Sequence, residues 1–137
     1  MKKMLVILLA ACACCAAVAA LTTANLREQV VLPAQSVAEG AMVTNVVAVS
    51  GYRGLGEVCV AVGPVAAASS NRTVTVTLEG TNTVSGGWSL VGAGTYRGAE
   101  AGVIRVQCQA DCLPGYIRVT ATNTTAASVL SGLLLAY

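Results

Sequence analysis

Three cysteines in the body of the chain carry the side chains best suited to covalent or metal chemistry: Cys59, Cys108 and Cys112. A disulfide between Cys108 and Cys112 would close a small loop, and either residue could instead pair with Cys59 across the sheets. A zinc site needs four ligands, and no histidine is present to complete the set, so we predict no metal site. The three cysteines could equally be reduced thiols that are buried as small apolar side chains. The sequence favours neither alternative, because disulfide formation depends on the redox state of the compartment.

The groups that most enzymes use for acid–base chemistry are missing or scattered. The chain has no histidine, which is the commonest general base, and Asp111 is its only aspartate. The glutamates do not share a motif, and no G-x-S-x-G, P-loop or dinucleotide-binding pattern is present. The glycines are typical of turns between strands. We therefore expect a non-catalytic protein that uses no cofactor.

Aromatic side chains are few, with one tryptophan, four tyrosines and no phenylalanine. Trp88, Tyr96 and Tyr52 could form a platform that binds a sugar or a protein partner, because such rings combine an apolar body with a polar tip. Aromatic residues that are spaced singly along strands and turns more often pack in a core or at an edge. Both interpretations of these three residues stay open at the level of sequence.

The charge of the chain is low and nearly balanced. Charged residues make up 10% of the sequence, against roughly 25% in typical soluble domains. Both lysines lie at the extreme N-terminus, and beyond them the arginines and the acidic residues are equal in number. A neutral body lacks the basic surface of a nucleic-acid-binding protein. It suits a domain that packs against its own copies or other proteins.

The N-terminus has the pattern of an export signal, in which a Lys-Lys pair precedes an uncharged apolar run over residues 4–21. An A-x-A cleavage site is readable at 17–19. The residues that end at Cys12 are similar to a bacterial lipobox, in which Cys12 would be lipidated. The run is also just long enough to span a bilayer, so residues 4–21 could contact a membrane. A helix that docks on a neighbouring subunit is a further alternative.

The remainder of the chain must supply the elements that position these side chains, and its pattern predicts strands. Apolar and polar residues alternate over Thr73–Glu79 and Tyr116–Thr122, which indicates strands with one buried and one wet face. Between the predicted strands lie turn clusters and a Gly-rich loop that contains Tyr96. The other predicted strands are a possible edge strand at 30–32, strands at 42–49, 57–62, 88–91 and 103–108, and a buried strand at 129–136.

These elements predict an all-β fold, an antiparallel β-sandwich or jelly-roll-like domain of seven or eight strands preceded by an N-terminal hydrophobic helix. We divide the chain into three parts. Residues 1–21 form a hydrophobic leader that serves as signal peptide, anchor or assembly helix. Residues 22–41 form a linker with the possible edge strand, and residues 42–137 form the sandwich.

From residue 46 to the C-terminus, the chain resembles small bacteriophage virion proteins of the head-decoration or minor-capsid type. The resemblance rests on an ordered series of segments: Gly51-Tyr52, Val58–Gly63, Thr73–Asn82, Trp88, Gly115–Thr122 and Ser131–Ala136. It implies a β-sandwich that binds and stabilises a capsid, often as a multimer, without a catalytic site. Its alternating Thr/Val strands also occur in many other β domains.

Two functions follow as hypotheses. The first is a structural protein of a virion that binds a capsid lattice or its own copies. The second is an exported bacterial module of the periplasm, outer surface or extracellular space, which Cys12 could anchor as a lipoprotein.

Overall fold

The computed structural model of the protein describes residues 27–49, 56–108 and 115–136. The predicted leader helix, Cys12, Tyr52 and Cys112 lie outside this part of the chain. No helix within it is long and apolar enough to cross a membrane. Its elements are β1 (Arg27–Val37), β2 (Met42–Ala48), β3 (Gly56–Val62), the short 3-10 helix η1 (Ala67–Ser69), β4 (Thr73–Thr81), β5 (Ser89–Arg97), β6 (Gly102–Cys108), β7 (Tyr116–Asn123) and β8 (Ser128–Ala136).

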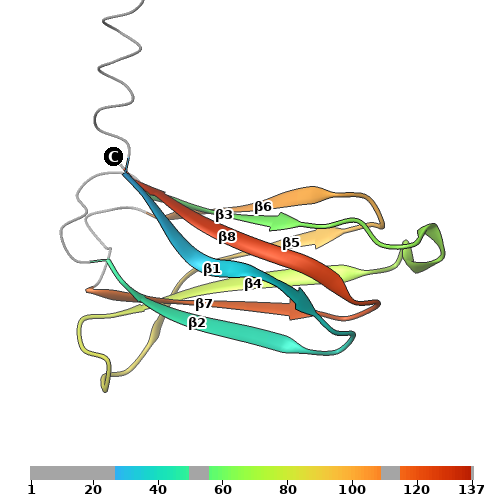
Figure 1. The fold of residues 1–137 in the computed structure, drawn as a ribbon. Coiled ribbons are helices and arrows are strands. Elements are labelled where there is room, and N and C mark those ends of the chain that lie inside the picture. The colour runs from blue at the N-terminus through green and yellow to red at the C-terminus, as the bar shows by residue number, and fades with distance from the viewer. Residues whose placement is uncertain (1–26, 50–55, 109–114, 137) are drawn as a thin grey trace, which may run out of the picture.

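The strands form two four-stranded antiparallel sheets that pack face to face (Figure 1). Sheet A has the order β1-β8-β3-β6, and sheet B has the order β2-β7-β4-β5. This interleaving of early and late strands is the order of a jelly roll, in which eight strands form two Greek keys. The predicted all-β sandwich is therefore confirmed.

The core lies between the sheets and consists mainly of valine and leucine. Alternation along β4 and β7 places every second residue inside, as the pattern predicts: Val74, Val76 and Leu78 of β4 are fully buried. Removing each such side chain from water contributes about 1.5–3 kcal/mol. The core residues are Val31, Leu32, Val37, Val49, Val58, Val60, Val62, Val74, Val76, Leu78, Ile104, Val106, Cys108, Ile117, Val119, Ala121, Leu130 and Leu134.

The first strand is longer than the predicted edge segment at 30–32, and it belongs to the sandwich. β1 spans eleven residues at the edge of sheet A and pairs with β8. Two irregularities interrupt this pairing on either side of Leu32. A bulge lets two consecutive side chains point the same way, which explains why Val31 and Leu32 are both buried. The Asn45 amide of β2 donates to the Val31 carbonyl at 2.9 Å and links the two edges.

The prediction of a short strand at 88–91 followed by a Gly-rich loop is wrong, because β5 continues to Arg97. The glycines in this strand allow β6 to approach closely. A Cβ atom at Gly92 would lie 2.8 Å from Val106 Cγ1, and one at Gly94 would lie 2.5 Å from Ile104 Cγ2. Glycine in a strand often marks such a close approach. The same residues that suggest a turn in the sequence thus close one side of the sandwich.

The two ends of the sandwich differ. At one end, Arg27 and Ala136 are register partners, so the first and last described strands meet there. We call this the terminal end; the β4–β5 connection lies there too (Figure 1). At the opposite end, the fully buried Arg72 links the β3–β4 and β5–β6 connections to the start of β8 by hydrogen bonds. Arg72 Nε donates to Gly98 O at 2.9 Å, Nη1 to Gly63 O at 2.6 Å and Ser128 Oγ at 3.0 Å, and Nη2 to Glu100 O at 2.8 Å.

Candidate functional site

The two residues of the predicted aromatic platform that lie in the described part of the chain, Trp88 and Tyr96, are not side by side. Trp88 lies just before β5 and its ring contacts Arg118, whose Cζ is 4.6 Å from the ring centroid. Tyr96 lies near the other end of β5, with its ring 5.6 Å from the Cζ of Arg72. The Tyr96 hydroxyl donates to the Glu100 carbonyl at 3.1 Å. At about 3.3 Å per residue, the two rings are separated by most of the length of the strand.

The outer face of sheet B carries a shallow polar groove of about 390 Å³. Cross-strand register brings Thr44, Thr120 and Thr77 into one row across β2, β7 and β4. The hydroxyls of Thr44 and Thr120 are 3.2 Å apart and share a hydrogen bond. We call this feature the threonine groove, and its lining residues are Met42, Thr44, Thr77, Glu79, Arg118 and Thr120.

An ion pair between Arg118 and Glu79 forms one wall of the threonine groove. These residues are register partners on β7 and β4, so their side chains emerge side by side on the outer face. Arg118 Nε and Nη2 lie 2.8 Å and 2.7 Å from the same carboxylate oxygen, Glu79 Oε2. Oε1 of Glu79 and Nη1 of Arg118 have no hydrogen-bond partner in the described part of the chain. The pair is thus fixed in place while keeping one acceptor and one donor group available.

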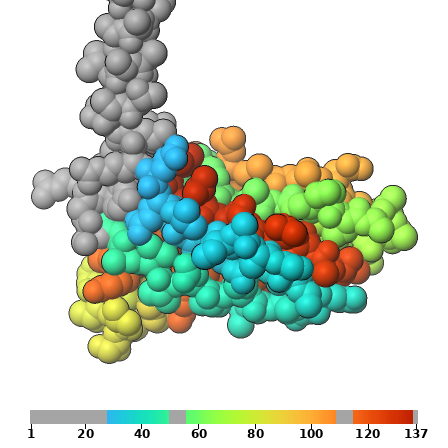
Figure 2. Space-filling model, viewed as in Figure 1, coloured from blue at the N-terminus to red at the C-terminus, as the bar shows by residue number. Residues whose placement is uncertain are grey.

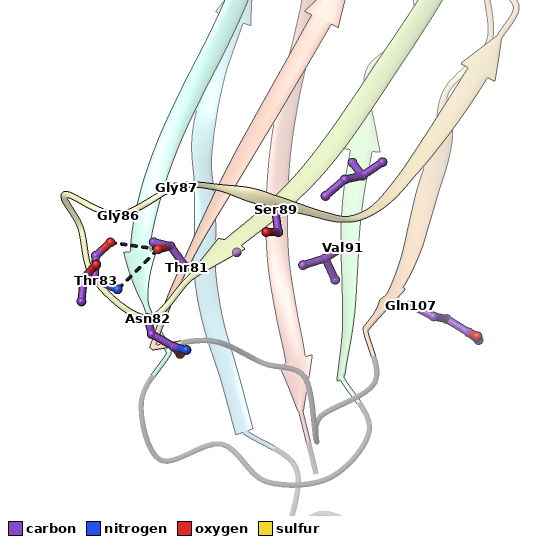
Figure 3. Close-up of a pocket in the computed structure, with 10 residues that line it drawn as sticks. Thr81, Asn82, Thr83, Gly86, Gly87, Ser89, Val91 and Gln107 are labelled. Carbon is purple, nitrogen blue, oxygen red and sulfur yellow. Dashed lines mark hydrogen bonds between the residues drawn. The ribbon is translucent and has the colours of Figure 1, made fainter.

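A larger pocket of about 700 Å³ lies at the terminal end, beneath the β4–β5 connection (Figure 3). Its polar groups are partly used by the loop itself. The Thr81 hydroxyl donates to the Thr83 carbonyl at 2.9 Å, and the Asn82 side chain accepts from Gly115 N at 3.3 Å. Gln107 of β6 also lines the pocket, and its side chain points away from the β4–β5 connection (Figure 3). None of the described residues that line this pocket is acidic or basic, so these residues offer neutral hydrogen-bonding groups and backbone.

The outer face of sheet A is apolar in places where a solvated sheet is usually polar. Val30, Val103, Val129 and Leu133 expose between 41% and 56% of their surface. This exposure corrects the prediction that 129–136 is simply a buried strand, because alternate side chains of β8 point outward. We call the four residues, together with Ala61, the sheet A apolar face. The ion pair Arg105–Glu57, at 3.7 Å, lies on the same sheet.

The cysteines of the described chain do not form a disulfide with each other. Cys59 of β3 is half-buried and points outward, whereas Cys108 at the end of β6 is buried in the core, and both are free thiols. Burial raises the pKa of Cys108 to about 11. Burial, together with the nearby Glu57 carboxylate, also raises the pKa of Cys59. In the described residues, no three histidine, cysteine or acidic side chains cluster as metal ligands would.

The pattern of the sequence did not single out the Arg118–Glu79 pair. Alternation does place Glu79 and Arg118 on the wet faces of their strands, as β4 and β7 show. The two residues are 39 positions apart, and only the register between the strands brings them together. The exposed residues of the sheet A apolar face were missed for a related reason, since a continuous apolar run resembles a strand buried on both faces.

No protein-family model matches the chain, and no curated protein matches it in sequence. The strand order defines the class, an eight-stranded β-sandwich with jelly-roll connections. Solved structures show a similar sandwich. The PBSX exported protein XepA gives a TM-score of 0.55 at 9% identity over 80% of this chain and 36% of its own.

Two further structures are similar over most of this chain. PNGase F, a glycosylasparaginase from Flavobacterium meningosepticum, gives a TM-score of 0.55 at 10% identity over 82% of this chain and 42% of its own. Dimeric latent PorU from Porphyromonas gingivalis gives 0.53 at 12% identity over 82% of this chain and 12% of its own. This chain therefore spans less than half of each of the three proteins. At such low identity, the likeness establishes the fold alone.

Proposed function

We propose that the protein is a non-catalytic structural component of a virion, which binds a capsid lattice or its own copies through the sheet A apolar face. The observation that carries the proposal is the exposure of four large aliphatic side chains on one sheet. Contiguous apolar patches on a soluble surface mark sites of protein–protein contact. The strands of sheet A follow one another across the surface, from β1 in blue through β8 in red and β3 in green to β6 in orange (Figure 2).

The register shows how the apolar side chains gather. Val30 is paired with Leu133, and Leu133 is paired with Cys59, so one row crosses β1, β8 and β3. Ala61 and Val103 are paired in a neighbouring row of β3 and β6. A sheet face of this kind is broad, and a shallow hollow of about 470 Å³ between Ala61, Val103 and Val129 interrupts it. Such a surface matches another protein surface better than it encloses a small molecule.

The fold is compatible with this role. Jelly rolls form the capsid domains of viruses and also the domains of lectins, so the architecture supports the proposal by analogy only. The similarity of the sandwich to the PBSX exported protein XepA is a second point, which concerns the fold alone. Neither point identifies the partner, and the exposed apolar residues remain the main argument.

An exported bacterial binding module is the second candidate function. The observation that favours it is the apolar run at 4–21 with its preceding lysines, which has the pattern of an export signal. XepA, which has a similar sandwich, is itself an exported protein, and this points the same way. The mass of the native protein separates the candidates. A chain that begins after the A-x-A site, or at a lipidated Cys12, supports export, whereas a chain in particles that begins at Met1 supports a virion component.

The virion proposal is tested on purified particles from the source that produces the protein. The chain should be found in the particles by mass spectrometry. Val129→Glu and Leu133→Glu should reduce its incorporation, because each places a charge in an apolar contact. Leu90→Glu is the control, since Leu90 is even more exposed than Val129 and Leu133 but lies on sheet B. Absence of the chain from particles, or equal incorporation of all three variants, would contradict the proposal.

A further inference from the structure

We propose that the threonine groove binds a neutral glycan, with the Arg118–Glu79 pair and the Thr44–Thr120–Thr77 row as its hydrogen-bonding groups. The groove lies on the outer face of sheet B, whereas the sheet A apolar face lies on the opposite side of the sandwich. The two surfaces therefore act independently, and glycan binding does not depend on virion assembly.

The charges in the groove favour a ligand without net charge. Arg118 and Glu79 are the charged side chains that line it, and they neutralise each other through two contacts below 3 Å. A phosphate or sulfate group would gain from Arg118 but would be repelled by Glu79 at the same position. A cation would be attracted by Glu79 but repelled by Arg118. A polyhydroxylated neutral molecule can use both groups, because a hydroxyl both donates and accepts hydrogen bonds.

The geometry of the pair suits neighbouring hydroxyl groups. Glu79 Oε1 can accept a hydrogen bond from one sugar hydroxyl, while Arg118 Nη1 donates to the next. Hydrogen bonds to charged groups of this kind are stronger than neutral ones. The Thr77 hydroxyl, which also has no partner in the described chain, extends the row of polar groups along the groove.

Apolar groups flank these hydrogen-bonding groups. Trp88 packs against the guanidinium group of Arg118, and Leu90 is the register partner of Glu79 on β5. Met42 closes the other side of the groove and is exposed. A sugar ring presents C–H groups on its faces and hydroxyls around its rim, so it can contact both kinds of side chain. The volume of about 390 Å³ falls in the range of roughly 300–1,000 Å³ that small-ligand sites occupy.

The test is affinity electrophoresis of the full chain through gels that contain a soluble neutral polysaccharide: dextran, xylan or mannan. Polygalacturonate, which is acidic, is the comparison. At least one neutral polysaccharide should retard the wild type. Glu79→Gln and Arg118→Met should each weaken that binding by about tenfold or more, because each removes a charged hydrogen-bonding group. Thermal unfolding of each variant verifies that it is folded.

The second ion pair provides matched controls. Glu57→Gln and Arg105→Met make the same chemical changes on sheet A and should leave the retardation unchanged. Three results would overturn the proposal: no retardation by any neutral polysaccharide, retardation by polygalacturonate alone, or equal loss in the groove variants and their controls. A protein that binds glycan but is absent from particles would refute the virion proposal and leave this one standing.

Discussion

Arg72 shows how a single charged residue can be accommodated inside a small aliphatic sandwich. Its side chain is completely buried, and its hydrogen-bond partners in the described residues are three carbonyls and one hydroxyl rather than a carboxylate. The planar guanidinium presents five donors in a fixed geometry, and four hydrogen bonds here use it. The residue joins the β3–β4 and β5–β6 connections to Ser128, the first residue of β8.

Replacing Arg72 should therefore be costly. Arg72→Met keeps the length of the side chain but leaves the carbonyls of Gly63, Gly98 and Glu100 without this donor. We expect the free energy of unfolding to fall by about 3–5 kcal/mol, measured by urea denaturation. Arg97→Met changes an exposed arginine of β5 and should cost less than about 0.5 kcal/mol. Similar losses in the two variants would show that the buried hydrogen bonds contribute little.

Cys108 should make stability depend on pH in the alkaline range. Burial raises the pKa of its thiol from 9.0 to about 11, so the folded state holds the proton more tightly than the unfolded state. The stabilisation is complete below pH 9 and is lost as the pH rises through 11. The difference in unfolding free energy between the wild type and Cys108→Ala should therefore shrink over this range. A constant difference from pH 8 to pH 11 would show that the thiol is not perturbed.

At the scale of elements, β5 and β6 show how two strands of different sheets close one side of the sandwich. Gly94 faces Ile104, and a Cβ atom there would lie 2.5 Å from Ile104 Cγ2. Gly94→Ala should cost about 1–3 kcal/mol by overpacking. Ile104→Ala removes that methyl group. In a double-mutant cycle, the variant with both changes should therefore lose less unfolding free energy than the sum of the losses in the two single variants. Gly87→Ala, which meets nothing within 4 Å, is the control.

The strands could be predicted from the sequence wherever one face is polar. Alternation over Thr73–Glu79 and Tyr116–Thr122 located β4 and β7 to within two residues of their ends, because burial on one face imposes period two. The predicted strand at 88–91 ends before β5 does, because a glycine that permits close packing looks the same in a sequence as one that permits a turn.

The candidate sites were less accessible to prediction. Their residues come together through pairings such as Glu79 with Arg118 and Val30 with Leu133, and these pairings depend on strand order. Local periodicity indicates which way a side chain points, but it does not indicate which strand lies beside it.

The two outer faces of the sandwich differ: sheet A exposes Val30, Val103, Val129 and Leu133, whereas sheet B carries the threonine groove beside the exposed Met42, Val46 and Leu90. If the apolar face drives association, sodium sulfate should strengthen self-association and cooling should weaken it, as measured by analytical ultracentrifugation. Val129→Glu should abolish the response to both. An association that sodium chloride weakens instead would indicate ionic contacts and contradict the role of the apolar face.

The pairing of Arg27 with Ala136 has a consequence for how such a module can be used. Because the chain enters and leaves the sandwich at neighbouring points, the folded unit could be spliced into an exposed loop of a host protein without pulling that loop apart. The same closeness would allow the two ends to be joined by a short linker and the chain reopened at the β4–β5 connection. The sandwich is in this sense a portable unit, because both ends of its described strands lie at one point of its surface.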